Sequence, residues 1–273
     1  MRLRFDFDLP RKRLIIPINY NHLLQAMIYH NLNHTLADFL HNRGFEYQKR
    51  IFRMFTFSRL YGHFQILKSN NSKSFILFDT PIYFYLSSPF EQLLQEFANR
   101  MVSGTSLHLD ENPLYLSSVQ VFMPPLLENN PTPVKMLSPI TVRTTTPQGE
   151  ESHTHKTHYY SPLEPRFSEL VRRNLWKKYL AFTQSLSENE IFDENPPSDL
   201  DIKPLRFSQQ KNFNLIIYKD YIIKGYTGIY QISGPRELKQ FAWDCGIGER
   251  NSQGFGMFDA WNPDEKKSIS HYS

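Results

Sequence analysis

The sequence of 273 residues contains a single cysteine, Cys245, and no hydrophobic run that approaches the length of a membrane span. One cysteine cannot form an internal disulfide, and a chain without disulfides fits a reducing compartment. The N-terminal segment alternates charged and apolar residues, so it lacks the apolar core of a signal peptide. These absences predict a cytoplasmic protein that is not embedded in a membrane.

Glycine is also scarce, yet four of the eleven glycines fall in one stretch, Gly246 to Gly256. A dinucleotide fingerprint would need a third glycine where this chain has Asn251, and no Gly-Lys-Ser/Thr is present for a P-loop. Both nucleotide motifs are therefore disfavoured. Two Gly-X-Gly steps around a polar run could instead present bare N–H groups to phosphate oxygens, or could form a tight structural turn.

Excess charge is modest, since the formal net charge is +4 and the pI is near 9.0. A net charge this small does not by itself indicate binding to a polyanion, but local clusters of positive charge could still bind one. One cluster surrounds Lys49 and Arg50, and another lies on a predicted helix that begins at Pro165. The cationic residues of that helix include Arg166, Arg172, Arg173 and Lys177. Each cluster could also be an ordinary solvated face.

Hydrophobic periodicity predicts the order strand, helix, strand, strand, helix, strand in residues 1–123. Apolar residues recur at helical spacing from Asn21 to Gly44, which places His30, His34 and His41 on one polar face. Asn33 could also cap a second helix, in which case two short helices would form and His41 would point elsewhere. The turn-forming residues 68–73 predict a β-hairpin between the two middle strands.

Prolines between residues 124 and 133 predict a linker, and a second pattern of strands and helices follows it. Strand material at 140–145 pairs with 157–160, a long helix runs from Pro165 to Leu186, and residues 187–198 have the composition of a loop. Four strands, a short helix at 235–243, the glycine loop and a last strand at 255–261 complete the chain. The prediction is an α+β protein of two tandem ferredoxin-like βαββαβ domains, 1–123 and 124–273.

Several segments together resemble the CRISPR repeat-processing endoribonucleases of the superfamily of repeat-associated RNA-binding proteins. The resemblance covers most of the chain, and its most specific segment is Gly246-Ile-Gly-Glu-Arg-Asn-Ser-Gln-Gly-Phe-Gly-Met257. Weaker matches support it, namely 17–29, Leu40-His41, Phe55-Thr-Phe-Ser58 and 137–142. The resemblance implies cleavage of CRISPR repeat RNA to mature guide RNAs, with no metal and no cofactor.

By motif position, the catalytic residues implied by the resemblance are Tyr29, His41 and a basic residue, either Arg53 or Lys49. Arg53 stands where relatives carry lysine, so the basic role stays open between these two. Histidine can move a proton in either direction near neutral pH, whereas an unperturbed tyrosine is too weak an acid to serve as a good base. In-line attack by the ribose 2′-OH would leave a 2′,3′-cyclic phosphate and a 5′-OH.

RNA binding is expected to be shared by the glycine loop and the basic helix. The loop residues are Gly246, Gly248, Arg250, Asn251, Ser252, Gly254, Phe255 and Gly256, and the helix residues are Arg166, Arg172, Arg173 and Lys177. Phe255 could stack on a base or could anchor the last strand in the core. The resemblance also leaves open membership of a CRISPR effector complex and pairing with a second copy.

Other sites and functions fit the sequence less well. The pair His30 and His34, and the group His153, His155 and His158, have metal-ligand types but no completing carboxylate or cysteine at ligand spacing, so no metal site is predicted. The main alternative function is a non-catalytic RNA-binding subunit of the same superfamily. An unrelated small-molecule binder with a ferredoxin-like fold is disfavoured by the basic helix.

Overall fold

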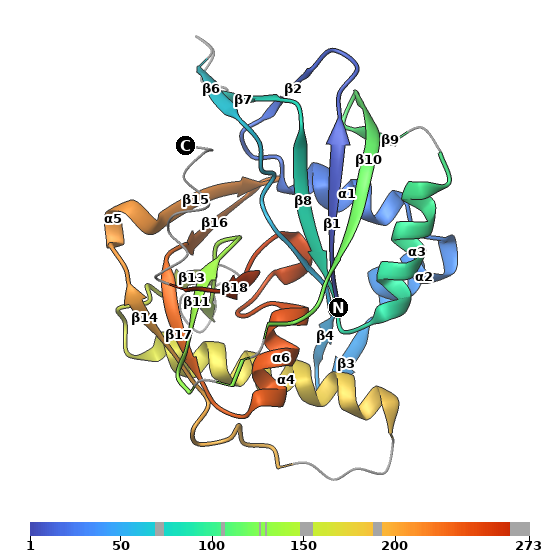
Figure 1. The fold of residues 1–273 in the computed structure, drawn as a ribbon. Coiled ribbons are helices and arrows are strands. Elements are labelled where there is room, and N and C mark those ends of the chain that lie inside the picture. The colour runs from blue at the N-terminus through green and yellow to red at the C-terminus, as the bar shows by residue number, and fades with distance from the viewer. Residues whose placement is uncertain are drawn as a thin grey trace.

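A computed structural model describes residues 1–68, 74–104, 107–125, 127–128, 130–147, 155–187 and 193–262. Two antiparallel sheets form the body of the molecule, and each belongs to one half of the chain (Figure 1). The predicted turn at 69–73 and the part of the predicted loop at 188–192 lie outside the described residues.

The first sheet has the order β5-β8-β1-β10-β9. Alternating residues of β1 (Arg2–Asp8) turn Leu3, Phe5 and Phe7 into a core that is covered by α1 (Asn21–His30) and α3 (Glu91–Val102). The neighbouring strands are β5 (Thr56–Phe57), β8 (Ile82–Ser87), β10 (Asn112–Phe122) and the added edge strand β9 (Leu107–Leu109). The four main strands follow the antiparallel ferredoxin-like arrangement, which confirms the predicted fold for this half.

The second sheet repeats the arrangement with the order β14-β17-β11-β18. Its strands are β11 (Thr132–Met136), β14 (Asp201–Arg206), β17 (Ile229–Ser233) and β18 (Phe258–Ala260). The connecting helices are α4 (Arg166–Leu186) and α6 (Arg236–Cys245). Two ferredoxin-like units in tandem are thus confirmed.

One strand assignment was wrong, because β11 begins within the proline-rich stretch 124–133 that was predicted as a linker and continues beyond it to Met136. The expected first strand at 140–145 is instead mostly β12 (Arg143–Pro147), which pairs with β13 (His155–Tyr159) in an inserted hairpin. Proline was the misleading signal. Pro133 sits next to the first residue of β11, where a missing N–H costs little, and Thr132, Val134 and Met136 alternate into the core.

The remaining elements are insertions around the two sheets. A small sheet joins β2 (Arg13–Pro17), β7 (Ser74–Asp79) and β6 (Phe64–Lys68), and two further hairpins pair β3 (Phe45–Tyr47) with β4 (Arg50–Phe52) and β15 (Phe213–Tyr218) with β16 (Tyr221–Tyr226). One helical turn, α5 (Gln209–Asn212), precedes β15. The hairpin β3-β4 packs on the second half, since the rings of Phe45 and Phe182 are 5.5 Å apart.

The segment from Asn21 to Gly44 does not form one continuous helix. It is divided at Asn33, as in the alternative prediction of two short helices. After α1 ends at His30, the side chain of Asn33 accepts a hydrogen bond of 2.9 Å from the Leu36 N–H and starts α2 (His34–Asp38). A single π-helical turn follows at η1 (Phe39–Arg43) and carries His41. Because the helix axis restarts at Asn33, His41 no longer shares one face with His30.

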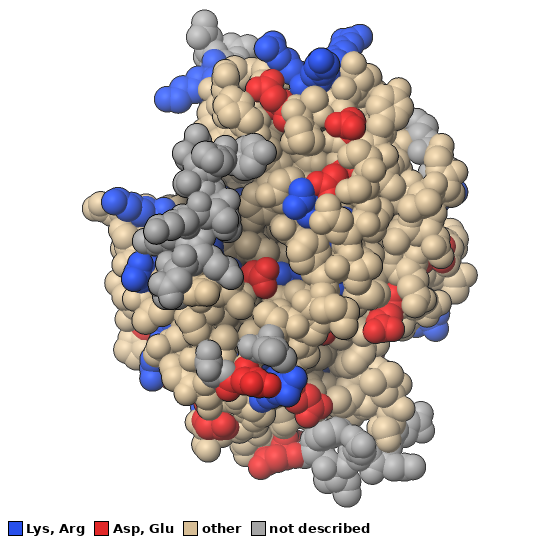
Figure 2. All heavy atoms as spheres, viewed as in Figure 1, with Lys and Arg blue, Asp and Glu red and all other residues tan. Residues whose placement is uncertain are grey.

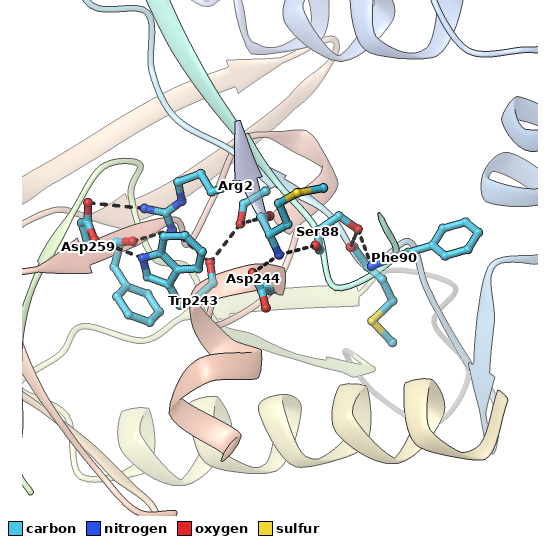
Figure 3. A network of polar contacts seen from close by, with 10 residues as sticks. Arg2, Ser88, Phe90, Trp243, Asp244 and Asp259 are labelled. Carbon is cyan, nitrogen blue, oxygen red and sulfur yellow. Dashed lines mark hydrogen bonds and ion pairs between the residues drawn. The ribbon is translucent and has the colours of Figure 1, made fainter. Parts of the chain in front are cut away.

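A buried arginine joins the two halves (Figure 3). Arg2 is fully buried, donates to the carbonyls of Trp243 (3.0 Å) and Phe258 (2.8 Å), and lies 3.9 Å from the centroid of the Trp243 ring. Burial lowers the pKa of Arg2 to about 10, and Asp259 partly offsets this effect. The first strand of the chain is therefore bonded to segments on both sides of the glycine loop.

Lys and Arg are interspersed with carboxylates on the face drawn in Figure 2, and a group of cations lies at the end formed by β2 and β6. Among the described residues, no helix combines the length and the apolar character that crossing a membrane requires.

Candidate functional site

A cleft of about 800 Å³ separates the hairpin β3-β4 and residues 53–55 from β12, α4 and the glycine loop. Four segments from both halves of the chain therefore line one hollow. Its charged lining is strongly one-sided, because a single carboxylate, Glu249, faces seven cations: Arg50, Arg53, Arg143, Arg173, Lys177, Lys178 and Arg250. Such a cleft concentrates anions.

The carboxylate of Glu249 links two of these cations across the cleft. Its oxygens lie 3.9 Å from Arg50 and 3.6 Å from Arg143. Burial raises the pKa of Glu249, and the neighbouring arginines oppose that rise. One carboxylate between two guanidinium groups orients them but leaves the cleft with a net positive charge.

The structure brings Tyr29, His41 and Arg53 together beside this cleft. The rings of Tyr29 and His41 lie 6.3 Å apart, edge to face. Arg53 donates from Nε to the Leu40 carbonyl at 3.0 Å and from Nη2 to the His41 carbonyl at 2.8 Å. The guanidinium thus holds the π-helical turn that carries His41 and also lines the cleft.

Protonation of these groups follows from their surroundings. Burial raises the pKa of Tyr29, and the charge of Arg53 partly offsets it, so the phenol stays protonated near neutral pH. The exposed His41 ring has Nδ1 2.9 Å from the Asn42 side-chain oxygen, and the Asn42 amide nitrogen donates to Asp38 at 2.5 Å. An amide oxygen only accepts, so Nδ1 carries a proton and Nε2 is left for a substrate.

Lys49, the competitor for the basic role, is placed differently. It is exposed in the turn between β3 and β4, and it does not line the cleft. Its neighbour Arg50 does. Within the described part of the chain, Arg53 is the candidate that contacts the segment bearing His41.

Helix α1 connects this group to the glycine loop. Asn21 donates to the carbonyls of Gln253 (2.9 Å) and Gly254 (3.3 Å), and Gln25 donates to the carbonyl of Ser252 at 2.7 Å. Tyr29 follows at the same four-residue spacing, which puts all three side chains on one face. The Gln25 oxygen accepts from the hydroxyl of Tyr218, whose pKa burial raises to about 12. One helical face therefore positions both the loop and Tyr29.

Glycine is needed in the loop mainly because the backbone is tightly packed. A Cβ on Gly256 would lie 1.9 Å from the Ile247 carbonyl oxygen, and one on Gly248 would lie 2.6 Å from the Thr141 oxygen. Both residues also have positive φ, +78° and +72°. The structural-turn interpretation therefore explains these two glycines without a ligand.

Four loop residues that line the cleft nevertheless keep backbone donors that no described residue accepts from. The N–H groups of Gly248, Arg250, Asn251 and Ser252 make no hydrogen bond to another described residue, whereas those of Ile247, Glu249 and Gly256 bond to carbonyls. The lining residues among those predicted for RNA binding are Gly248, Arg250, Asn251, Ser252, Arg173 and Lys177.

The other residues predicted to bind RNA do not line this cleft. Gly246, Gly254, Phe255 and Gly256 are buried and do not line the cleft. Phe255 is 0% exposed, so its ring offers no face on which a base could stack. Of the two alternatives for this residue, the structure therefore favours an anchor for the last strand in the core. Arg166 and Arg172 lie outside the lining for different reasons. Arg172 is turned about 100° around α4 from Arg173, whereas Arg166 lies two turns before Arg173, with its guanidinium 5.7 Å from the centroid of the Tyr160 ring.

No three His, Cys, Asp or Glu side chains gather as a metal site in the described parts of the chain. His158 bonds to Glu164 at 2.8 Å in the predicted polar hairpin, while His153 and the side chain of His155 lie outside the described residues. His30 and His34 are exposed.

Several lining and positioning residues were not predicted from the sequence: Asn21, Gln25, Arg143 and Tyr218. Arg50 was identified only as part of a basic cluster, and no separate role was assigned to Lys178. The four-residue spacing of Asn21, Gln25 and Tyr29 was a signal that could have indicated a shared face. Arg143 and Tyr218 sit on inserted hairpins, and nothing local to their sequence indicates where those hairpins fold.

Two family models match consecutive parts of this chain. Residues 15–120 match the N-terminal model of the CRISPR-associated protein Cas6, and residues 123–260 match its C-terminal model. This chain belongs to the Cas6 family. The resemblance drawn from the glycine-loop segment is thereby confirmed.

Relatives within the Cas6 family span nearly the whole chain. A CRISPR-associated endoribonuclease Cas6 of Methanocaldococcus jannaschii is 27% identical over 93% of this chain and 91% of the relative. One from Pyrococcus furiosus is 25% identical over 89% of this chain and 82% of the relative. A solved structure of a CRISPR-associated protein Cas6 covers 96% of this chain and 99% of its own, with a TM-score of 0.69 and 26% identity.

Proposed function

We propose that this protein is a metal-independent endoribonuclease that cleaves CRISPR repeat RNA in the cytoplasm to give guide RNAs. The observation that carries the proposal is the meeting of Tyr29, His41 and Arg53 at the edge of a cleft lined by seven cations. Relatives named as Cas6 endoribonucleases support the same activity.

The geometry supports a division of chemical roles. His41 exchanges a proton through Nε2, either taking it from the ribose 2′-OH or giving it to the departing 5′-oxygen. Tyr29, kept protonated by its burial, donates a hydrogen bond that orients the reacting group. Arg53 stabilises negative charge on the phosphorane, and the products are a 2′,3′-cyclic phosphate and a 5′-OH.

The cleft would hold the RNA backbone. Arg50, Arg143, Arg173 and Lys177 attract phosphates, and the N–H groups of Gly248, Arg250, Asn251 and Ser252 donate to their oxygens. Since α1 bonds to the loop through Asn21 and Gln25, a phosphate held by the loop lies in a fixed relation to Tyr29.

The test is to incubate the repeat RNA of the adjacent array with the protein in EDTA and to compare wild type with His41→Ala. A single cut that leaves a 2′,3′-cyclic phosphate and vanishes in the variant is expected. Unchanged cleavage by the variant would reject His41 as the proton-transfer group. Binding without any cleavage by the wild type would reject the enzyme in favour of a non-catalytic RNA-binding subunit.

A further inference from the structure

A buried lysine lies directly beneath the glycine loop. Lys178 is on α4 and is only 3% exposed, although it follows the more accessible Lys177. Its ammonium Nζ lies 2.5 Å from the Gly246 carbonyl oxygen, 2.9 Å from the Asn251 side-chain oxygen and 3.4 Å from the Gly248 carbonyl oxygen. An ammonium has three N–H donors, and these three oxygens together with the Cys245 thiol surround it, so no donor lacks a partner within the protein.

Asn251 extends this contact across the loop. Its amide nitrogen donates to the carbonyls of Ile247 at 3.1 Å and Phe255 at 3.0 Å, while its oxygen accepts from Lys178. Both amide hydrogens and the oxygen are therefore used within the protein. Lys178 and Asn251 together tie the two ends of the loop to α4.

A buried charge needs a reason, because removing an ammonium from water is costly unless polar groups replace its hydration. Burial lowers the pKa of Lys178, and Cys245 and Glu249 nearby partly offset it. An apolar side chain could fill the same volume without that cost. What the ammonium provides, and an apolar side chain could not, is hydrogen bonds to the acceptors that surround Nζ.

We propose that Lys178 is a positioning residue for RNA binding, acting through the loop and not by touching RNA. By bonding the carbonyls of Gly246 and Gly248, it keeps these oxygens, which would repel phosphate, away from the ligand. The N–H groups of the same segment are then left for the cleft. This inference rests on the proposed RNA-binding function.

The neighbouring Lys177 is the matched comparison. It lies on the same helix and lines the same cleft, but it is partly exposed. A lysine that neutralises a phosphate releases counterions, so its removal should reduce the slope of log K against log salt by about 0.7 on a single strand. Removing a lysine that only positions N–H groups should leave that slope unchanged.

The experiment measures binding of repeat RNA over a range of salt concentrations for wild type, Lys178→Met and Lys177→Met. For Lys178→Met we expect a dissociation constant raised about tenfold, as for loss of one charge-assisted hydrogen bond, at every salt concentration. For Lys177→Met we expect a smaller loss and a reduced slope. At saturating RNA, the single-turnover cleavage rate of Lys178→Met should stay within a few-fold of wild type, and amide exchange in residues 246–256 should be faster without RNA.

Two outcomes overturn the assignment. A salt slope reduced as in Lys177→Met would show that Lys178 neutralises a phosphate directly, and wild-type affinity in Lys178→Met would show that it does not position the loop. Should Lys178→Met fail to fold, Asn251→Ala breaks the same link from the loop side and must raise the dissociation constant with an unchanged slope. If wild type itself binds no repeat RNA, the proposed function fails first.

Discussion

Helices α1 and α4 occupy the same position in the two halves, since each joins the first and second strands of its ferredoxin-like sheet. Their structures differ. The first helix stops after ten residues, restarts at Asn33 and ends in a π-helical turn, whereas α4 continues without a break for 21 residues.

Under the proposed function, this difference assigns different roles to the two halves. The broken helix brings His41 beside Tyr29 and lets Arg53 bond its backbone, so the first half would supply the groups for proton transfer. The continuous helix holds Arg173 and Lys177 on one face beside the cleft and places Lys178 beneath the glycine loop, so the second half would supply positive charge and support the loop.

The largest effect should come from His41→Ala in the broken helix. General acid–base catalysis contributes roughly 10²- to 10⁴-fold, so the single-turnover cleavage rate should fall by about that factor while RNA affinity changes little. His34→Ala, on the exposed side of α2, is the control and should cleave like wild type. A matching loss in both variants would contradict the special placement of His41.

Arg53→Lys should have the next largest effect. Lysine keeps the charge but cannot reproduce the two bonds to the carbonyls of Leu40 and His41, so the cleavage rate should fall by about 10²-fold. Lys49→Ala is the control, because Lys49 is exposed in a turn outside the cleft lining. A stronger loss with Lys49→Ala would move the basic role from Arg53 to Lys49.

On the continuous helix, Arg173→Ala should weaken RNA binding a few-fold and reduce the salt slope by about 0.7 without changing the rate at saturating RNA. The control is Arg172→Ala, one residue away but outside the cleft lining. Salt titrations of both variants measure the difference. Equal salt slopes for Arg173→Ala and Arg172→Ala would mean that the face of α4 that lines the cleft does not contact RNA.

The smallest effect concerns how α4 is held to its sheet. Asp201 on β14 accepts from Ser168 of α4 and pairs with Lys203 at 2.5 Å. Burial raises the pKa of Asp201, but the bonds from Lys203 and Ser168 outweigh it, and the net pKa lies below its ordinary value. The carboxylate therefore stabilises the fold above its unfolded pKa of about 3.9, and this is lost as pH falls through the folded pKa.

Asp201→Asn should thus lower the free energy of unfolding by no more than about 1 kcal/mol at neutral pH, with a difference that shrinks below about pH 4. Thermal unfolding across this pH range measures it, and the exposed Asp199→Asn is the control. A difference that grows as the pH falls would reverse the assigned direction of the pKa shift.

Much of this could be predicted from the amino-acid sequence. Period-two and helical patterns predicted both ferredoxin-like units, and motif position indicated Tyr29, His41 and a basic residue that was either Arg53 or Lys49. The clearest failure was β11, because prolines mark loops locally but are tolerated near the start of a strand. The whole glycine loop was expected to bind RNA, yet Phe255 and three of its four glycines do not line the cleft.

What the sequence determined by itself was local: which residues alternate or recur, where a helix can be capped, and which side chains can carry protons or charge. Only the tertiary structure decided which of them meet. Arg50, Arg143, Arg173 and Arg250 come from four separate segments, and their shared cleft exists only because the two halves pack around Arg2 and the loop. Long-range contacts of this kind depend on the packing of whole sheets, which no local pattern encodes.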